Sequence, residues 1–310
     1  MKIPVALVTG FLGSGKTTLV SRLLQHPDMG ETAVIVNELG EVGIDHHLLR
    51  RVDERTVLMP SGCLCCALRG DLADELRDLK ARRDAGEIPP FERVVVETTG
   101  LANPAPIVST LLSEPLVTHH FRLEAVVTTV DAQHGLRHDE SVGQAAAADR
   151  LVVTKSDLAD PSAVIERLRR LNPGATLVEA LFGDVEPAAL FDAVREHDPR
   201  DLDYDESPEH AHEIRAFCVT FDEPLDWIAF GIWLTMLLQA RGSDVLRVKG
   251  LLDVGADGPL VLNGVQHVVH PPEHLPEWPD EDRRSRLVFI ARGIEREALE
   301  RSLTAFCRAA

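Results

Sequence analysis

An apolar run at residues 3–9 leads directly into Gly-Phe-Leu-Gly-Ser-Gly-Lys-Thr-Thr at residues 10–18. Starting at Gly10, this segment has the G-x-x-x-x-G-K-[ST] pattern of a phosphate-binding loop between a predicted strand and a predicted helix. Its glycines let backbone N–H groups turn toward a phosphate, and the helix beginning near Lys16 adds the positive end of its dipole. Lys16 supplies a mobile charge, and the Thr17 hydroxyl is a natural Mg²⁺ ligand. The alternative is a glycine-rich turn, but the flanking strand and helix favour a site for a nucleoside triphosphate.

The base of that nucleotide is indicated by Thr154-Lys155-Ser156-Asp157, which follows an apolar run at residues 151–153. The Asp157 carboxylate can accept from both the ring N–H and the exocyclic amine of guanine, a donor pair that adenine lacks. The Lys155 stem can lie along the face of the base. Alone, this match is also typical of a strand-to-helix turn with Asp157 near a cap. After a phosphate loop in the correct chain order it favours guanine, with Thr154 where asparagine is more usual.

Three carboxylates that follow predicted strands are candidates for the metal side of this site. Glu97 ends an apolar strand where a carboxylate commonly supports Mg²⁺ through water, although it could instead cap the next turn. Gly100 would let the backbone approach the γ-phosphate, as a loop that senses the nucleotide state must. Glu38 and Glu41 follow the second predicted strand, where each could meet Mg²⁺ or a second metal, or remain a solvated loop charge.

Three of the five cysteines stand together as Cys63-Leu-Cys65-Cys66. Three thiolates within four residues can chelate a soft or borderline d-block cation. Because Zn²⁺ is tetrahedral, a fourth ligand would come from Glu38, Glu41, a histidine or a transferable group, and an incomplete shell suits a site that hands its metal on. The alternatives are buried cysteines or a redox pair of Cys63 and Cys66.

Composition limits the class of protein. The formal net charge of −18 over 310 residues argues against a nucleic-acid-binding or an anionic-membrane surface. A hydrophobic content of 45% is enough for a full core. No apolar run reaches the roughly 18 residues of a membrane span, and the cysteines do not form a disulfide framework, so we expect a cytoplasmic protein.

Up to residue 196 the chain alternates short apolar runs with segments of helical period. Such alternation predicts an α/β fold, a doubly wound and mostly parallel sheet covered on both faces, with ligands at the carboxyl ends of the strands. The predicted strands are residues 5–9, 33–37, 56–59, 93–97, 123–130, 151–154 and 176–179, and predicted helices include 17–24, 71–83 and 161–171.

The acidic segment 197–212 contains two prolines and has no apolar period, so it is interpreted as a linker between domains 1–196 and 213–310. The second domain is predicted as a smaller α+β unit with a mostly antiparallel sheet. Its predicted strands are residues 213–221, 244–249, 260–262, 265–269 and 286–291, its predicted helices are 226–239 and 295–306, and a Pro-rich loop covers 271–279.

Taken together, the motifs GFLGSGKTT (10–18), NELGE (37–41), GCLCC (62–66), ETTGLANP (97–104) and TKSD (154–157) resemble the CobW-type P-loop GTPases. RVKG (247–250), VQHVVHPP (265–272) and Trp278 extend the resemblance over nearly the whole chain. It implies metal-dependent GTP hydrolysis coupled to insertion of a metal into client proteins. It implies that Glu97 supports hydrolysis, that Cys63, Cys65 and Cys66 carry the metal, and that GTP and Mg²⁺ are cradled by Gly13, Ser14, Gly15, Lys16, Thr17 and Thr18.

Many relatives have a long histidine-rich tract before the second domain, whereas here His197, His210 and His212 stand among six acidic residues. A solvated linker and a weak metal-collecting loop both fit this composition.

The resulting hypothesis is a GTPase that delivers a metal, zinc in the first place, to a client protein. Its rivals are an insertion GTPase for cobalt or iron, of the cobalamin-synthesis or nitrile-hydratase type, and a GTP-gated metal or redox sensor that delivers nothing.

Overall fold

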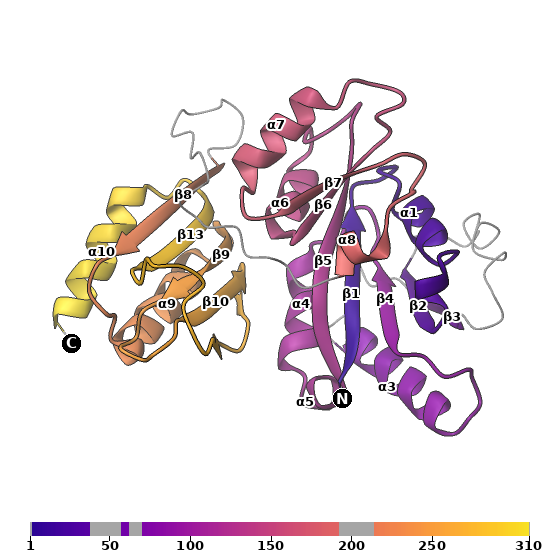
Figure 1. Ribbon diagram of the computed structural model, residues 1–310, viewed down its shortest axis with the longest axis horizontal. Helices are drawn as coiled ribbons and strands as arrows, with labels where there is room; N and C mark the ends of the chain where they lie inside the picture. Colours follow the sequence, from indigo (N-terminus) through magenta and orange to yellow (C-terminus); the bar gives the residue numbers. More distant parts are fainter. Residues whose placement is uncertain (1, 38–56, 62–69, 192–213, 310) are drawn as a thin grey trace. The chain divides into compact units, whose positions relative to one another are not determined.

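The computed structural model describes residues 2–37, 57–61, 70–191 and 214–309. The chain forms two compact units, Met1–Leu168 with Ala175–Arg195, and Arg169–Gly174 with Glu196–Ala310 (Figure 1). Among the described residues, no helix combines the length and the apolar character that crossing a membrane requires.

The first unit is built on a seven-stranded sheet in the order β3-β2-β4-β1-β5-β6-β7, with every neighbouring pair parallel. Strands β4 and β6 are buried along nearly their whole length, as expected where both faces of a parallel sheet are covered. The strands are β1 Ile3–Gly10, β2 Thr32–Asn37, β3 Val57–Ser61, β4 Arg93–Glu97, β5 Phe121–Asp131, β6 Arg150–Thr154 and β7 Thr176–Ala180.

Helices cover both faces of this sheet (Figure 1). On one face, apolar residues of α1 and α8 join a buried cluster with alternate residues of the central strands. Helices α4, α5 and α6 contact β5, and α3 contacts α4 and α5. The predicted doubly wound α/β fold is confirmed. The helices are α1 Lys16–Leu23, α3 Gly70–Asp84, α4 Pro104–Ser113, α5 Pro115–His120, α6 Asp139–Ala147, α7 Ser162–Leu171 and α8 Pro187–Phe191, with a 3₁₀ turn at Pro27–Met29.

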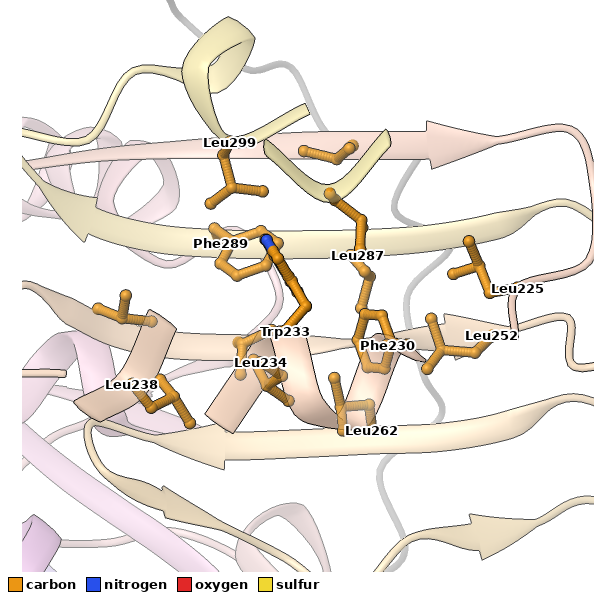
Figure 2. Packing of buried hydrophobic residues seen from close by; sticks show 14 of the residues in the cluster. Leu225, Phe230, Trp233, Leu234, Leu238, Leu252, Leu262, Leu287, Phe289 and Leu299 are labelled. Atoms are coloured by element: carbon orange, nitrogen blue, oxygen red, sulfur yellow. The ribbon is translucent and has the colours of Figure 1, made fainter. Parts of the chain in front are cut away.

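The second unit contains an antiparallel sheet in the order β11-β10-β9-β13-β8, with β12 paired to β10. Helix α9 packs against this sheet through Phe230, Trp233 and Leu234, and α10 adds Leu299 (Figure 2). Asp226 caps α9 by accepting from Ala229 N at 2.9 Å. The elements are β8 Ile214–Phe221, α9 Trp227–Arg241, β9 Val245–Leu252, β10 Leu260–Val265, β11 Val268–Val269, β12 Glu273–His274, β13 Ser285–Arg292 and α10 Arg296–Ala309.

Two details of the second unit differ from the prediction. The predicted break between residues 262 and 265 is absent, because β10 continues through Asn263 and Gly264. The chain instead turns at Gln266, which has φ +51, before β11 begins. The predicted Pro-rich loop at 271–279 also contains a short strand, β12.

Candidate nucleotide-binding site

Backbone geometry shapes the phosphate-binding loop between β1 and α1. Gly10, Gly13 and Gly15 have φ values of +142, +71 and +96, which L side chains rarely adopt. A Cβ built on Gly13 would meet nothing within 4 Å, so space is open at that point of the loop. Gly15 is the N-cap of α1, and since it has no side chain, no cap competes with a phosphate for the N–H groups of the first turn.

Lys16 is folded over this loop. Its Nζ donates to the carbonyl oxygens of Gly10 at 2.8 Å and Phe11 at 3.1 Å, and the residue is 8% exposed. Both bonds are to neutral acceptors, so an anionic phosphate in the loop offers the ammonium a stronger, charge-assisted partner. The Lys16 ammonium is therefore held against the phosphate-binding loop itself.

Two buried hydroxyl groups from neighbouring strands of the sheet hydrogen-bond the phosphate-binding loop. Thr129 Oγ1 of β5 hydrogen-bonds Ser14 Oγ at 2.6 Å. Thr154 Oγ1 of β6 donates to Ser14 O at 2.7 Å. Thr154, which the sequence predicted on the base side of the site, is 4% exposed and lies against the backbone of the phosphate loop. Only a short hydroxyl side chain is needed for this contact, which gives a physical reason for threonine at this position.

Two of the predicted metal-side residues, Thr17 and Glu97, meet at the start of α1. Thr17 Oγ1 donates to Glu97 Oε1 at 2.6 Å, although the two residues are 80 positions apart in the chain. Strands β1 and β4 are hydrogen-bonded neighbours, so the end of β4 lies beside the loop that follows β1. Glu97 is 3% exposed. A hydroxyl and a carboxylate form a set of hard oxygen donors, which is the chemistry that Mg²⁺ selects.

The segment that follows Glu97 packs tightly against the phosphate loop. A Cβ on Gly100 would lie 2.6 Å from Leu12 N and 2.7 Å from Leu12 Cα, so only glycine fits there. On the other side, the buried Gln144 of α6 donates through Nε2 to Gly100 O at 3.1 Å and Ala102 O at 2.9 Å. The loop that would meet a γ-phosphate is thus held between the phosphate loop and α6.

The predicted base-side residues lie in the turn after β6. Lys155 has φ +58, and its Nζ donates to Asp131 Oδ2 at 2.5 Å. Asp157 is exposed in the same turn, which Leu158 N closes by donating to Lys155 O at 3.0 Å. The loop after β7 also reaches the site, because a Cβ on Gly183 would lie 2.8 Å from the carbonyl oxygen of the sequence-predicted Thr18.

Sequence reasoning missed Thr129, Asp131 and Gln144. The polar residues at the end of β5 interrupt an otherwise apolar run just before its carboxyl end, and that position was the available signal. Gln144 carries no such signal, because it stands in a short alanine-rich helix.

The predicted metal ligands Glu38, Glu41, Cys63, Cys65 and Cys66 lie outside the described residues. Within the residues that the structure does describe, no group of three or more histidine, cysteine, aspartate or glutamate side chains is arranged to hold a metal ion.

Comparison with known proteins identifies the family. Residues 4–179 match the model of the CobW/HypB/UreG nucleotide-binding domain, and residues 214–307 match that of the cobalamin synthesis protein cobW C-terminal domain. The chain is 33% identical over 305 residues to the zinc chaperone YjiA of Escherichia coli, covering 93% of both chains. It is 25% identical over 350 residues to zinc-regulated GTPase metalloprotein activator 1 of Schizosaccharomyces pombe, covering 95% of this chain and 83% of the relative.

The crystal structure of the Zn(II)-bound YjiA GTPase from E. coli superposes with a TM-score of 0.74 at 28% identity, covering 99% of each chain. The likeness therefore extends over both units, and the resemblance predicted from the motifs is confirmed. The chain belongs to the CobW/HypB/UreG family of P-loop GTPases.

Proposed function

We propose that this protein is a GTP-hydrolysing metallochaperone that binds zinc through Cys63, Cys65 and Cys66 and delivers it to a client protein. The observation that carries the proposal is the full-length similarity to a protein named as a zinc chaperone. Residues 1–196 would form the GTPase domain and residues 213–310 the second domain, with the acidic segment 197–212 as the linker. The three thiolates supply the ligand chemistry that Zn²⁺ prefers, with Glu38 or Glu41 as candidates for the fourth position.

The described residues support the nucleotide half of this proposal. The N–H groups of the loop and of the first turn of α1 bind phosphate oxygens. Lys16 exchanges its hydrogen bonds to two neutral carbonyl oxygens for stronger bonds to the charged phosphates. Phosphoryl transfer depends mainly on positioning of the reacting groups and on neutralisation of charge. Hydrogen bonds from Thr129 and Thr154 hold the phosphate loop in place before the nucleotide binds, so the loop is preorganised for this reaction.

Thr17 and Glu97 fit the Mg²⁺ that accompanies the nucleotide in this family. Both are oxygen donors, they lie 2.6 Å apart, and Thr17 stands in the first turn of α1 beside Lys16. Mg²⁺ would neutralise charge on the β- and γ-phosphates. Thr17 would hold the cation, and Glu97 would orient Thr17 and the surrounding water.

Delivery of the metal requires that the state of the bound nucleotide control the affinity of the protein for the metal. In the sequence, the cysteine motif lies between the segment of Glu38 and Glu41 and the strand that ends at Glu97. If GTP orders these segments, it should bring the thiolates into one shell, and hydrolysis should release the ion. Linkage then requires that GTP and metal raise each other's affinity by the same factor, typically roughly 5–150-fold.

A competition titration tests this proposal. Zn²⁺ and Co²⁺ affinities are measured with GDP and with a non-hydrolysable GTP analogue, for the wild type and for Cys65→Ser. We expect tighter metal binding in the triphosphate state, loss of that difference in Cys65→Ser, and transfer of zinc to a metal-free client only during hydrolysis. Equal affinity in the two nucleotide states would exclude delivery by this mechanism.

A further inference from the structure

Asp131, the last residue of β5, divides its two carboxylate oxygens between two tasks. Oδ1 accepts from the backbone N–H groups of Gln133 at 2.6 Å and His134 at 3.1 Å, which fixes the turn after the strand. Oδ2 faces the neighbouring strand end and accepts from Lys155 Nζ at 2.5 Å, with His134 Nδ1 at 3.3 Å. The Asp131 side chain is 8% exposed, so its carboxylate is largely shielded from water.

Lys155 is held in a conformation that a lysine does not adopt readily. Its φ of +58 is in the left-handed region, which disfavours residues with a Cβ. The side chain is 33% exposed and its ammonium reaches across to the end of β5, so the charged end is tethered while part of the side chain faces solvent. An untethered lysine would sample many rotamers. Binding a base against its stem would then restrict the side chain to one of them, at a cost in conformational entropy.

We propose that Asp131 is a positioning residue for nucleotide recognition, which anchors the Lys155 ammonium so that the lysine stem is already in place against the face of the guanine base. This inference rests on the proposed guanine-nucleotide site and assigns it a new residue. Ordering one long side chain corresponds to roughly 5–30-fold in affinity. Loss of the anchor should therefore weaken GDP binding by a factor in that range.

The division between Oδ1 and Oδ2 makes a sharp test possible. Asp131→Asn keeps an oxygen that can accept from the two backbone N–H groups and replaces the oxygen that binds Lys155 with an NH₂ group. Lys155→Met keeps an unbranched stem and removes the ammonium. We expect each variant to weaken binding of GDP with Mg²⁺ roughly 5–30-fold, and the double variant to be no weaker than either single one. Additive losses would overturn the proposal, because the two residues would then act independently.

A ligand without a base distinguishes anchoring of Lys155 from damage to the phosphate loop. Asp131 and Ser14 line the same cavity of about 160 Å³, so a change at Asp131 could also reach the loop. Tripolyphosphate with Mg²⁺ should bind the wild type and Asp131→Asn equally well if Asp131 acts through Lys155. An equal loss for tripolyphosphate and GDP would overturn the inference.

Different outcomes would contradict the proposed guanine specificity and the proposed role of Asp131. If the wild type binds ADP as tightly as GDP, the guanine assignment is wrong, and the comparison of Asp131→Asn with Lys155→Met still decides the role of Asp131 on the nucleotide that binds. If the wild type prefers GDP and Asp131→Asn binds it with unchanged affinity, the anchoring role alone is wrong.

Discussion

Thr17 in the first turn of α1 and Glu97 at the end of β4 are 80 positions apart in the chain, and a hydrogen bond of 2.6 Å joins Thr17 Oγ1 to Glu97 Oε1. The contact exists because β1 and β4 are parallel neighbours, with Val8 paired to Glu97. Both strands end at the same edge of the sheet, so the first turn of α1, which follows the phosphate-binding loop after β1, meets the last residue of β4 there.

Replacing Glu97 with glutamine should slow hydrolysis while nucleotide binding remains. The amide keeps an oxygen that accepts from Thr17, but it removes the negative charge that, in the proposed function, would support Mg²⁺ beside the phosphates. Loss of such an indirect metal contact typically costs roughly 10–100-fold in activity. Phosphate release under saturating GTP measures the effect, and the increase in melting temperature caused by GDP checks that the site is intact. Unchanged turnover would assign Glu97 a purely structural role.

Gly100→Ala should damage the site through a steric clash with the phosphate loop. The new methyl group would lie 2.6 Å from Leu12 N, and backbone atoms cannot move aside as a flexible side chain can. Overpacking of this kind costs about 1–3 kcal/mol, and here it should also lower GTP affinity. Chemical denaturation and nucleotide titration measure the two effects.

Gly143→Ala is the matched control for that substitution. Gly143 stands inside α6, and a Cβ there would meet nothing within 4 Å. Alanine should therefore raise the free energy of unfolding by about 0.5–1 kcal/mol and leave turnover unchanged. If both alanine variants behave alike, the close approach of Gly100 to Leu12 is not what constrains this loop.

Much of the fold follows from local patterns in the sequence. Apolar runs such as residues 94–96 and 151–153 are buried on both faces, so they can be recognised without knowledge of their partner strands. The break placed between residues 262 and 265 shows the limit of this reasoning. Asn-Gly is a common hairpin dipeptide, but Asn263 and Gly264 pair with Lys249 and Val248 inside β10. Tertiary pairing overrides the local turn preference there, and the chain turns at Gln266.

Some residues of the candidate site can be predicted from a local motif, whereas others depend on contacts between segments that are distant in the sequence. Lys16 and Thr17 belong to a contiguous motif, which sequence reveals directly. Asp131 and Gln144 act on segments that are 24 and 44 positions away, so their roles exist only once the sheet has brought those segments together. The polar end of an apolar run marks the position of Asp131 in the sequence but not its partner, and a glutamine in an alanine-rich helix is not marked at all.

Gln144→Leu should loosen the loop that follows Glu97. Leucine has a similar size but leaves the carbonyl oxygens of Gly100 and Ala102 without the amide that bonds both. Removing one partner from buried groups costs about 1–3 kcal/mol each, so we expect a clear fall in the free energy of unfolding and in turnover. The exposed Glu140 of the same helix provides a control, since Glu140→Gln should change neither quantity. Wild-type turnover in Gln144→Leu would show that this loop needs no support from α6.

Asp131 should make the free energy of unfolding depend on pH in the acid range. Burial alone would raise the pKa of this carboxyl, but hydrogen bonds from Lys155 and from the N–H groups of Gln133 and His134 hold the pKa below its ordinary value of 3.8. Because the pKa is lowered in the folded state, the contribution of Asp131 is complete above pH 3.8 and is lost as the pH falls below that value. The advantage of the wild type over Asp131→Asn in denaturant titrations should therefore shrink in acid. A difference that stays constant with pH would contradict this account.

Guanine nucleotides should stabilise the protein more than adenine nucleotides do. Asp157 is exposed in the turn after β6, where its carboxylate is available to the two donors of guanine, and adenine would leave that carboxylate without a matching donor pair. GDP with Mg²⁺ at about 100 times its dissociation constant should add roughly 2.7 kcal/mol. For a unit of this size, that corresponds to an increase in melting temperature of roughly 5–10 °C. ADP at the same concentration should give a much smaller increase, and Asp157→Ala should reduce the GDP effect toward the ADP level. If ADP and GDP stabilise the wild type equally, Asp157 does not read the base.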